Sequence, residues 1–193
     1  MLLITMIYPI VVYGHPVLRK IAEDVDKDYP GLDRLINDLF ETMYHAEGIG
    51  LAAPQIGKSV RIFVIDGSPA SEDDPSMDGF KKAFVNAHIT ERSGELLPMT
   101  EGCLSIPLLR EEVNRESHIK IEYYDQNWEF HVEIYDGYRA RVILHEYDHL
   151  DGVMFTDRVG PLRKRLLKGK LNAISKGIFE VDYRTILPGR KVK

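Results

Sequence analysis

The chain has 193 residues, of which 44% are hydrophobic, and its formal net charge at pH 7 is −5. This length suits one domain that buries a core, so residues 1–193 are expected to form a single domain. The negative charge argues against specific binding of nucleic acid. The single cysteine excludes a disulfide within the chain, which fits a reducing cytoplasm.

Residues 1–12 are apolar, but Pro9 interrupts them, they lack a basic start, and they are too short to span a bilayer. They predict a buried strand or a packed arm, and we expect a cytoplasmic protein without a membrane partner. Residues 32–47 predict the first long helix, because apolar side chains recur there at helical spacing and Gly48 follows.

Short strands are predicted at residues 61–65 and 82–85, where apolar side chains cluster. Between them, residues 66–79 are rich in Asp, Ser, Pro and Gly, which predicts a mobile loop. Residues 119–124 and 128–134 alternate apolar and polar side chains around a short polar turn, a pattern typical of a β-hairpin.

The next predicted element is a largely apolar helix over residues 138–150, with Asp136 as its candidate N-cap and Gly152 just past its end. Residues 158–176 then predict a basic helix, which we expect to present a solvated face. A strand is predicted at residues 179–186. The leucines of the basic helix that are available for packing are Leu162, Leu166 and Leu167.

The apolar helix carries the sequence His145-Glu146-Tyr-Asp-His149. Residues four apart share a helix face, so His145 and His149 can offer two imidazole nitrogens to one metal ion. Glu146 can lean over the same face without ligating and can accept a proton from water there. Without a metal, a buried histidine pair would need hydrogen bonds to the backbone, which is the alternative interpretation.

A catalytic metal site of this kind needs a third protein ligand and one open position for water. The extended pattern HExxHxxGxxH would place a third histidine at residue 155, but that residue is Phe155, which cannot bind a metal. Glu180 remains a candidate ligand further along the chain. The single cysteine, Cys103, is the better candidate, because a thiolate and two imidazoles suit zinc or iron.

Three blocks of the sequence resemble the peptide deformylase family: GIGLAAPQ at residues 48–55, EGCLS at residues 101–105 and HEYDH at residues 145–149. They stand in the family's order and at about its spacing, and GHPVLR at residues 14–19 resembles the family's opening segment. The resemblance implies an α+β fold in which antiparallel β-sheets pack around a central helix that carries the HExxH motif.

The resemblance also implies that Cys103, His145 and His149 bind the metal, while Glu146 serves as general base and then as general acid. It favours ferrous iron (Fe2+) as the native metal, with Zn2+, Ni2+ or Co2+ as substitutes. One position departs from the family. Leu144 stands where the family commonly has glutamine, so packing beside the first metal histidine is expected to differ.

The resemblance further implies that the amide of Gln55 and the backbone N–H of Leu104 stabilise the oxyanion of the tetrahedral intermediate. Gly48, Ile49 and Gly50 would present backbone groups to the main chain of the substrate. The glycines allow unusual backbone angles or close approach of the main chain to a ligand.

The implied function is hydrolysis of the N-formyl group from N-formylmethionyl peptides and nascent chains, with release of formate. In some family members a C-terminal helix docks on the ribosome, so the basic helix is a candidate for that contact. The enzymatic alternative is an HExxH metalloprotease with a cysteine ligand. The non-enzymatic alternative is a metal-stapled domain or binding module without catalysis.

Overall fold

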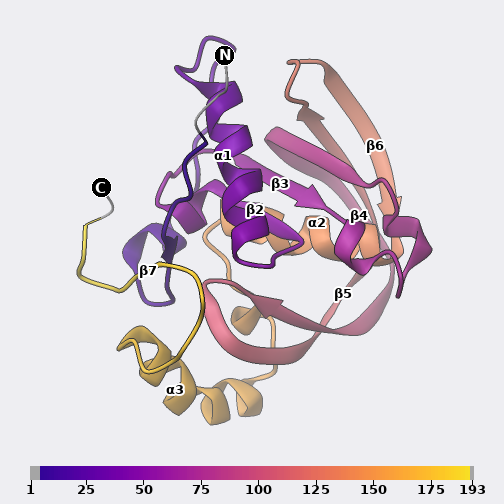
Figure 1. Cartoon of the computed structure of the whole chain (residues 1–193). Coiled ribbons are helices and arrows are strands. Elements are labelled where there is room, and N and C mark those ends of the chain that lie inside the picture. Colours follow the sequence, from indigo (N-terminus) through magenta and orange to yellow (C-terminus); the bar gives the residue numbers. More distant parts are fainter. Residues whose placement is uncertain (1–4, 192–193) are drawn as a thin grey trace.

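The computed structural model describes residues 5–191, and Figure 1 shows how its elements are arranged. Helices and antiparallel strands are mixed along the chain, which confirms the predicted α+β class. The strands and α-helices are β1 (Ile10–Val11), α1 (Leu32–His45), β2 (Gly50–Ala52), β3 (Ile62–Asp66), β4 (Lys81–Cys103), β5 (Ile106–Tyr124), β6 (Phe130–Asp136), α2 (Gly137–Leu150), α3 (Pro161–Ser175) and β7 (Thr185–Ile186).

Five strands form one antiparallel sheet in the order β2-β3-β4-β5-β6. The β4–β5 hairpin is its longest pair, with Val85 opposite Tyr124 at one end and Cys103 opposite Ile106 at the other. Register shifts interrupt this pair at several points, and such irregularities bend strands and increase their twist. Figure 1 shows the hairpin curving around one side of α2.

Both β4 and β5 extend far beyond the short strands predicted from their apolar residues. The reason lies on the inward face of β5, where the charged residues Glu111 and Arg115 are buried beside Leu109 and Val113. A charged residue at an inward position hides the alternation of apolar and polar residues by which a strand is recognised. Only the more apolar end of β5 was therefore visible in the sequence.

The aliphatic stripe of α1 is buried as predicted, including Leu35, Leu39 and Met43. These side chains pack in one cluster with residues of β2, β3 and β4. The helix ends at His45, two residues before the predicted end, and Glu47 beyond it has a left-handed φ of 55°. This turn leads the chain directly into β2.

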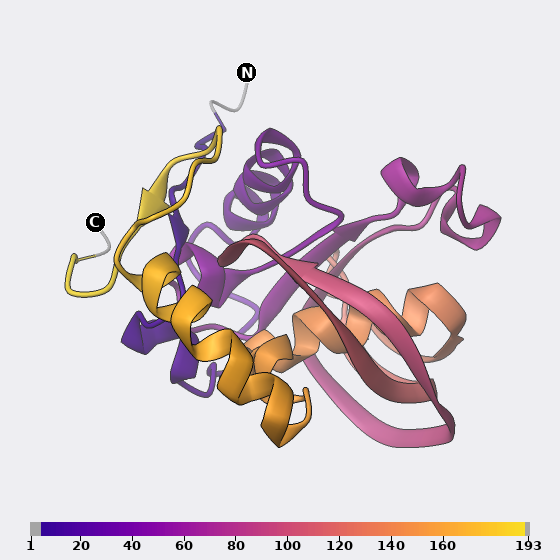
Figure 2. The same cartoon turned by 90° about the horizontal axis from the view of Figure 1, so that it is seen from below.

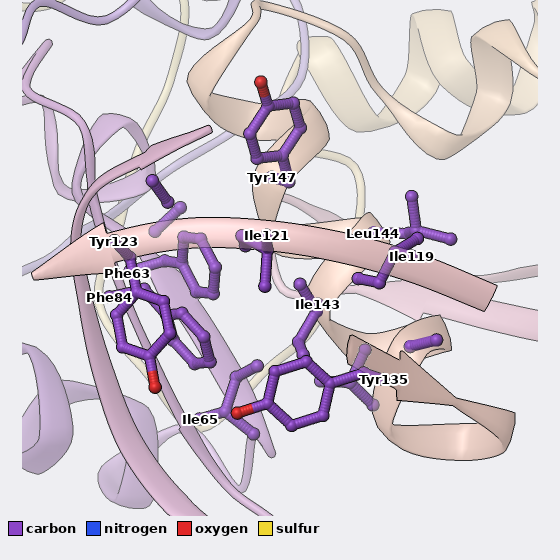
Figure 3. Close-up of a cluster of buried hydrophobic side chains, with 14 of the residues drawn as sticks. Phe63, Ile65, Phe84, Ile119, Ile121, Tyr123, Tyr135, Ile143, Leu144 and Tyr147 are labelled. Atoms are coloured by element: carbon purple, nitrogen blue, oxygen red, sulfur yellow. The ribbon is translucent and has the colours of Figure 1, made fainter. Parts of the chain in front are cut away.

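The helix α2 packs against β2, β3, β5 and β6, and all its residues from 140 to 150 are buried. In Figure 3, Ile143 and Leu144 lie in the same apolar cluster as Ile119 and Ile121 of β5. Leu144 is fully buried there, so apolar contacts surround the position at which this sequence departs from the family pattern. Asp136 is the N-cap residue, although its side chain makes no capping hydrogen bond.

The segment predicted as a loop between β3 and β4 contains two short 3-10 helices, Ser68–Ala70 and Pro75–Met77. Met77 anchors this segment, because its side chain is fully buried in the cluster that also contains Phe80.

The C-terminal helix α3 buries Leu167, whereas Leu162 and Leu166 are 71% and 63% exposed. Only one of the three leucines considered for packing is therefore buried. The strand predicted at residues 179–186 shortens to β7, which pairs in parallel with β1. Figure 2 shows the yellow C-terminal segment beside the indigo N-terminal segment. Residues 1–4 of the predicted N-terminal arm lie outside the described residues. Among residues 5–191, no helix is long and apolar enough to cross a membrane.

Candidate metal centre

The structure brings the three predicted metal ligands together from two elements. Cys103 is the last residue of β4, and His145 and His149 lie one turn apart on α2. The candidate ligand atoms of the three residues lie within 4.8 Å of one another, and Cys103 Sγ is 3.3 Å from His149 Nε2. Both histidines are buried and Cys103 is half-buried, so the cluster is largely withdrawn from solvent.

The donor set fits a metal ion, because its atoms are already oriented for one. Glu101 Oε2 lies 2.8 Å from His145 Nδ1, which leaves Nε2 of that ring for a cation. Glu146 Oε2 is buried and has no hydrogen-bond partner within the described part of the chain. One sulfur and two imidazole nitrogens are the ligand types that zinc and iron accept.

The charges of the site favour the ligating form of the cysteine. Burial alone would raise the pKa of Cys103, but the neighbouring His149 and His145 lower it to about 5. Burial raises the pKa of Glu146 to about 7, against the opposing effect of both histidines. Glu146 can therefore both accept and release a proton near neutral pH.

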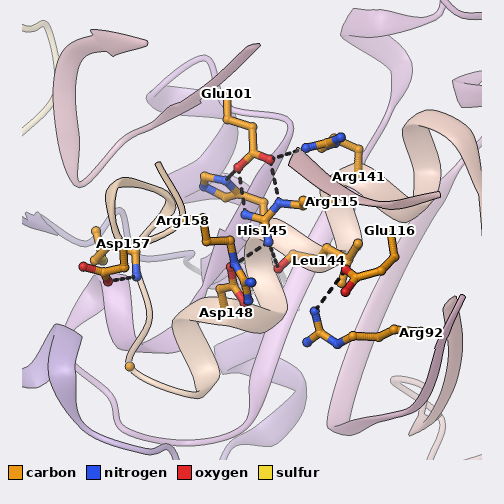
Figure 4. Close-up of polar contacts among 12 residues, drawn as sticks. Arg92, Glu101, Arg115, Glu116, Arg141, Leu144, His145, Asp148, Asp157 and Arg158 are labelled. Atoms are coloured by element: carbon orange, nitrogen blue, oxygen red, sulfur yellow. Dashed lines mark hydrogen bonds and ion pairs between the residues drawn. The ribbon is translucent and has the colours of Figure 1, made fainter. Parts of the chain in front are cut away.

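A buried ion cluster holds His145 in place, as Figure 4 shows. The carboxylate of Glu101 accepts hydrogen bonds from Arg115 Nε at 2.6 Å, Arg115 Nη2 at 2.8 Å and Arg141 Nη1 at 2.9 Å, besides its contact with His145. These partners hold the pKa of Glu101 well below its usual range against the effect of burial, which raises it. The carboxylate therefore stays charged beside the imidazole that it orients.

The same cluster continues to the other side of α2. Arg115 Nη1 donates to Asp148 Oδ2 at 2.7 Å, and Arg158 also donates to both oxygens of Asp148. Arg115, which is 1% exposed, thereby connects β5 with Glu101 of β4 and with Asp148 of α2. Sequence reasoning missed Arg115, Arg141 and Arg158, because nothing in the local pattern distinguishes them from surface arginines.

The glycine-rich block lies against Glu146. A Cβ atom added to Gly50 would lie 2.5 Å from Glu146 Oε1, and one added to Gly48 would lie 2.9 Å from Leu104 Cδ1. Neither glycine has φ in the left-handed region. Glycine is therefore needed at both positions because neighbouring side chains approach closely, and not because of an unusual backbone angle. Ile49 lies between them and is half-buried.

Gln55 is fixed with its amide nitrogen toward the cluster. Its Oε1 accepts the backbone N–H of Ala52 at 2.8 Å, and its Nε2 donates to Ser105 Oγ at 3.3 Å and toward Cys103 Sγ at 3.5 Å. The side chain is 2% exposed, so its orientation does not depend on solvent. Leu104 forms, with Ser105, the turn that follows Cys103.

Phe155, at the position where the extended motif has a histidine, and Glu180, the other candidate ligand, have other places in the structure. Phe155 is 1% exposed and its ring stacks on that of His145, with 6.1 Å between the ring centres. Among residues 5–191, the candidate metal-binding side chains form two groups, and Glu180 belongs to neither of them. One is Cys103, His145 and His149, and the other is Asp125, Glu129 and His131. Of the two candidates for a third ligand, Cys103 is the one that lies beside both histidines.

The chain is similar to known proteins over most of its length. The family model described as polypeptide deformylase matches residues 7–165. The chain is 51% identical to a peptide deformylase of Christiangramia forsetii, over 96% of this chain and 98% of that one. It is 48% identical to a peptide deformylase of Flavobacterium psychrophilum, over 96% of this chain and 100% of that one.

Solved structures agree with the sequence relatives. A peptide deformylase from Thermotoga maritima superposes with a TM-score of 0.73 and 42% identity, covering 81% of this chain and 99% of that chain. A peptide deformylase from Synechococcus elongatus, in complex with actinonin, superposes with a TM-score of 0.76 and 36% identity, covering 95% of each chain.

Proposed function

This chain belongs to the peptide deformylase family, and on that basis we propose that it hydrolyses the N-formyl group of N-formylmethionyl peptides and releases formate. The observation that carries the proposal is the convergence of Cys103, His145 and His149 beside the unpartnered carboxylate oxygen of Glu146. Three ligands and a separate base are the composition of a catalytic rather than a closed structural metal site.

We propose that Cys103, His145 and His149 hold the metal ion, with Fe2+ as the native metal and Zn2+, Ni2+ or Co2+ as substitutes. The ion would act as a Lewis acid on the formyl oxygen and would make water a better nucleophile. Glu146 would accept the proton of the attacking water and pass it to the leaving amine nitrogen, so one carboxyl group serves both halves of the hydrolysis. The resulting products are formate and a peptide with a free amino terminus.

Gln55 and Leu104 are proposed to donate hydrogen bonds to the oxygen that becomes negatively charged. The amide nitrogen of Gln55 already points toward Cys103, and the fixed position of its Oε1 prevents the side chain from rotating away. Loss of one such donor typically costs about 3–4 kcal/mol of transition-state stabilisation.

The block from Gly48 through Ile49 to Gly50 is proposed to bind the main chain of the substrate. Gly50 is the first residue of β2, an edge strand of the sheet, and an extended peptide can add to such an edge through backbone hydrogen bonds. The close approach of Glu146 to Gly50 would place the bound peptide next to the base.

Formate release tests this function directly. Purified protein should release formate from formyl-Met-Ala, and the variant Glu146→Ala should bind metal and fold normally yet lose at least about 100-fold in kcat. Cleavage of internal peptide bonds with the formyl group left in place would instead support the metalloprotease alternative. Full activity of Glu146→Ala would contradict the role of Glu146 as the base.

We propose that residues 1–193 act as one catalytic domain in the cytoplasm, on nascent chains, with α3 at its end as the helix considered for a ribosome contact. Arg163 is already paired with Glu111, with Nη2 2.7 Å from Oε1, so Lys164 and Arg165 would carry such a contact. Unchanged cosedimentation with ribosomes after reversal of both charges would contradict it.

A further inference from the structure

The turn that follows Cys103 is held from outside the hairpin. Leu104 and Ser105 are the two residues that connect β4 and β5. The carbonyl oxygen of Ser105 accepts the backbone N–H of Tyr13 at 2.8 Å, and that of Leu104 accepts the hydroxyl of Tyr183 at 2.8 Å. Both carbonyl groups of the turn are thus bonded to segments near the ends of the chain.

These two holding segments are joined to each other. One residue separates Tyr13 from the end of β1, and one residue separates Tyr183 from the start of β7. The two strands pair in parallel. Hydrogen bonds run from Ile10 N to Arg184 O at 2.8 Å and from Val12 N to Ile186 O at 2.9 Å. Figure 2 shows the C-terminal segment beside the N-terminal one. The two segments that hold the turn are therefore hydrogen-bonded to each other through the β1–β7 pair.

Tyr183 is well placed to act as a lasting hydrogen-bond donor. Its ring packs against the apolar cluster formed by α1, β2 and β3, which Leu104 also contacts. A phenol hydroxyl carries its proton near neutral pH, so the hydroxyl of Tyr183 is a donor to the Leu104 carbonyl. The residue lies beyond residues 7–165, the part that matches the family model.

Rotation of the turn is limited by these bonds. Each peptide unit is planar, so orientation of the unit that carries the Leu104 N–H depends on only two torsion angles per residue. The peptide unit that carries the Leu104 N–H precedes these two carbonyl groups. It is anchored at one end by the pairing of Cys103 with Ile106 and at the other by the Leu104 carbonyl that Tyr183 holds. The N–H of Leu104 itself donates to no partner among residues 5–191, so it is left for a ligand.

We propose that Tyr183 is a positioning residue for deformylation: its hydroxyl holds the Leu104 carbonyl, so that the Leu104 N–H stays directed at the formyl oxygen. The proposal rests on the function proposed above, because holding the Leu104 carbonyl aids catalysis only if the Leu104 N–H stabilises the oxyanion. In this role the C-terminal segment supports the active site without contacting the substrate.

The variant Tyr183→Phe tests the proposal, because it removes the hydroxyl and keeps the ring. We expect kcat for formyl-Met-Ala to fall about five- to tenfold, the effect of one lost hydrogen bond, with KM within about twofold and bound metal unchanged. Tyr29→Phe is the matched control. Tyr29 packs against the same cluster but makes no side-chain hydrogen bond to another described residue, so its variant should retain wild-type kcat.

A second readout does not depend on activity. In the zinc-loaded protein, 15N relaxation should give Leu104 and Ser105 backbone order parameters of about 0.85, falling below about 0.6 in Tyr183→Phe and unchanged in Tyr29→Phe. If the wild type released no formate, the proposed function would be wrong. The order parameters would still test whether the Tyr183 hydroxyl holds the turn. Unchanged kcat and order parameters in Tyr183→Phe, or equal losses in both variants, would overturn the proposal.

Discussion

At the scale of single residues, the site depends on close packing of side chains as much as on charge. Glu146 approaches the main chain of Gly50 so closely that no larger residue fits there, and the amide of Gln55 is fixed by one backbone N–H. The base is thereby held between α2 and the β2 edge strand, where a bound peptide would lie. The contact between Glu146 and Gly50 joins two different blocks of the sequence, whereas the hydrogen bond of Gln55 lies within one block.

The variant Gly50→Ala should lose activity because its Cβ would lie 2.5 Å from Glu146 Oε1 and would displace the carboxyl group. We expect kcat/KM to fall at least about 100-fold, since misplacing a catalytic group by about 1 Å can cost that much. Metal content, measured on the same samples, should not change.

Gly169→Ala in α3 is the control for that substitution. An added Cβ there meets no atom within 4 Å, and alanine in a helix interior is about 0.5–1 kcal/mol more stable than glycine. Its variant should keep full activity and a slightly higher Tm. Full activity of Gly50→Ala would contradict the assigned position of the base.

At the scale of elements, the buried ion cluster connects β4, β5 and α2 more specifically than apolar contacts do. Arg115 from β5 bonds Glu101 of β4 and Asp148 of α2, with all three side chains at most 4% exposed. Such a cluster tolerates few substitutions, because removing one partner leaves a buried charge without compensation.

Arg115→Met should therefore destabilise the fold by about 3–5 kcal/mol, the usual effect of breaking a buried pair. Urea unfolding of both proteins would measure the difference. Arg19→Met is the matched control, because its ion pair with Asp157 is 44% and 38% exposed and should contribute less than about 1 kcal/mol. Equal losses in the two variants would contradict the importance of burial.

A second polar cluster joins β4, β5 and β6 at Glu133 and predicts a pH dependence. Burial would raise the pKa of Glu133, but Lys82, Tyr123 and Tyr135 lower it from 4.5 to about 2. Because the folded pKa is depressed, the stabilisation is complete above about pH 4.5 and is lost as the pH falls toward about 2. The free energy of unfolding of wild type should therefore fall more steeply in that range than that of Glu133→Gln.

Urea unfolding at a series of pH values would check this, with the two proteins compared at each pH. The difference between their unfolding free energies should shrink as the pH falls from about 5 to about 2. A difference that stays constant across this range would show that Glu133 has the same pKa in the folded and unfolded chain.

At the scale of the whole molecule, the candidate metal centre joins parts of the chain that are far apart in sequence. Cys103 and His149 are separated by 46 positions, and the turn after Cys103 is held by segments from both ends of the chain. A metal ion at this point would bind only the folded arrangement, because the unfolded chain does not assemble the three ligands.

Removal of the metal should therefore lower the stability of the entire fold. With the ion at about 100 times its Kd, binding adds about 2.7 kcal/mol to the free energy of unfolding. We expect Tm to fall on treatment with a chelator and to recover on addition of Fe2+, Zn2+, Ni2+ or Co2+. In Cys103→Ala the Tm should respond much less to either treatment, and an equal response would contradict the role of Cys103.

Local geometry explains what could be predicted without the structure. The spacing of His145, Glu146 and His149 places them on one helix face by covalent geometry alone, and the three sequence blocks indicated the family. The aliphatic stripe of α1 was visible for the same reason. The long strands were not visible, because buried charges such as Arg115 interrupt their apolar alternation.

Contacts between distant segments were decided by folding. Three contacts depend on how the β4–β5 hairpin bends and pairs. Cys103 lies against α2, Arg115 is buried between two carboxylates, and Tyr183 reaches the Leu104 carbonyl. These positions follow from packing across the whole chain, and no short stretch of residues encodes such packing in a periodic pattern.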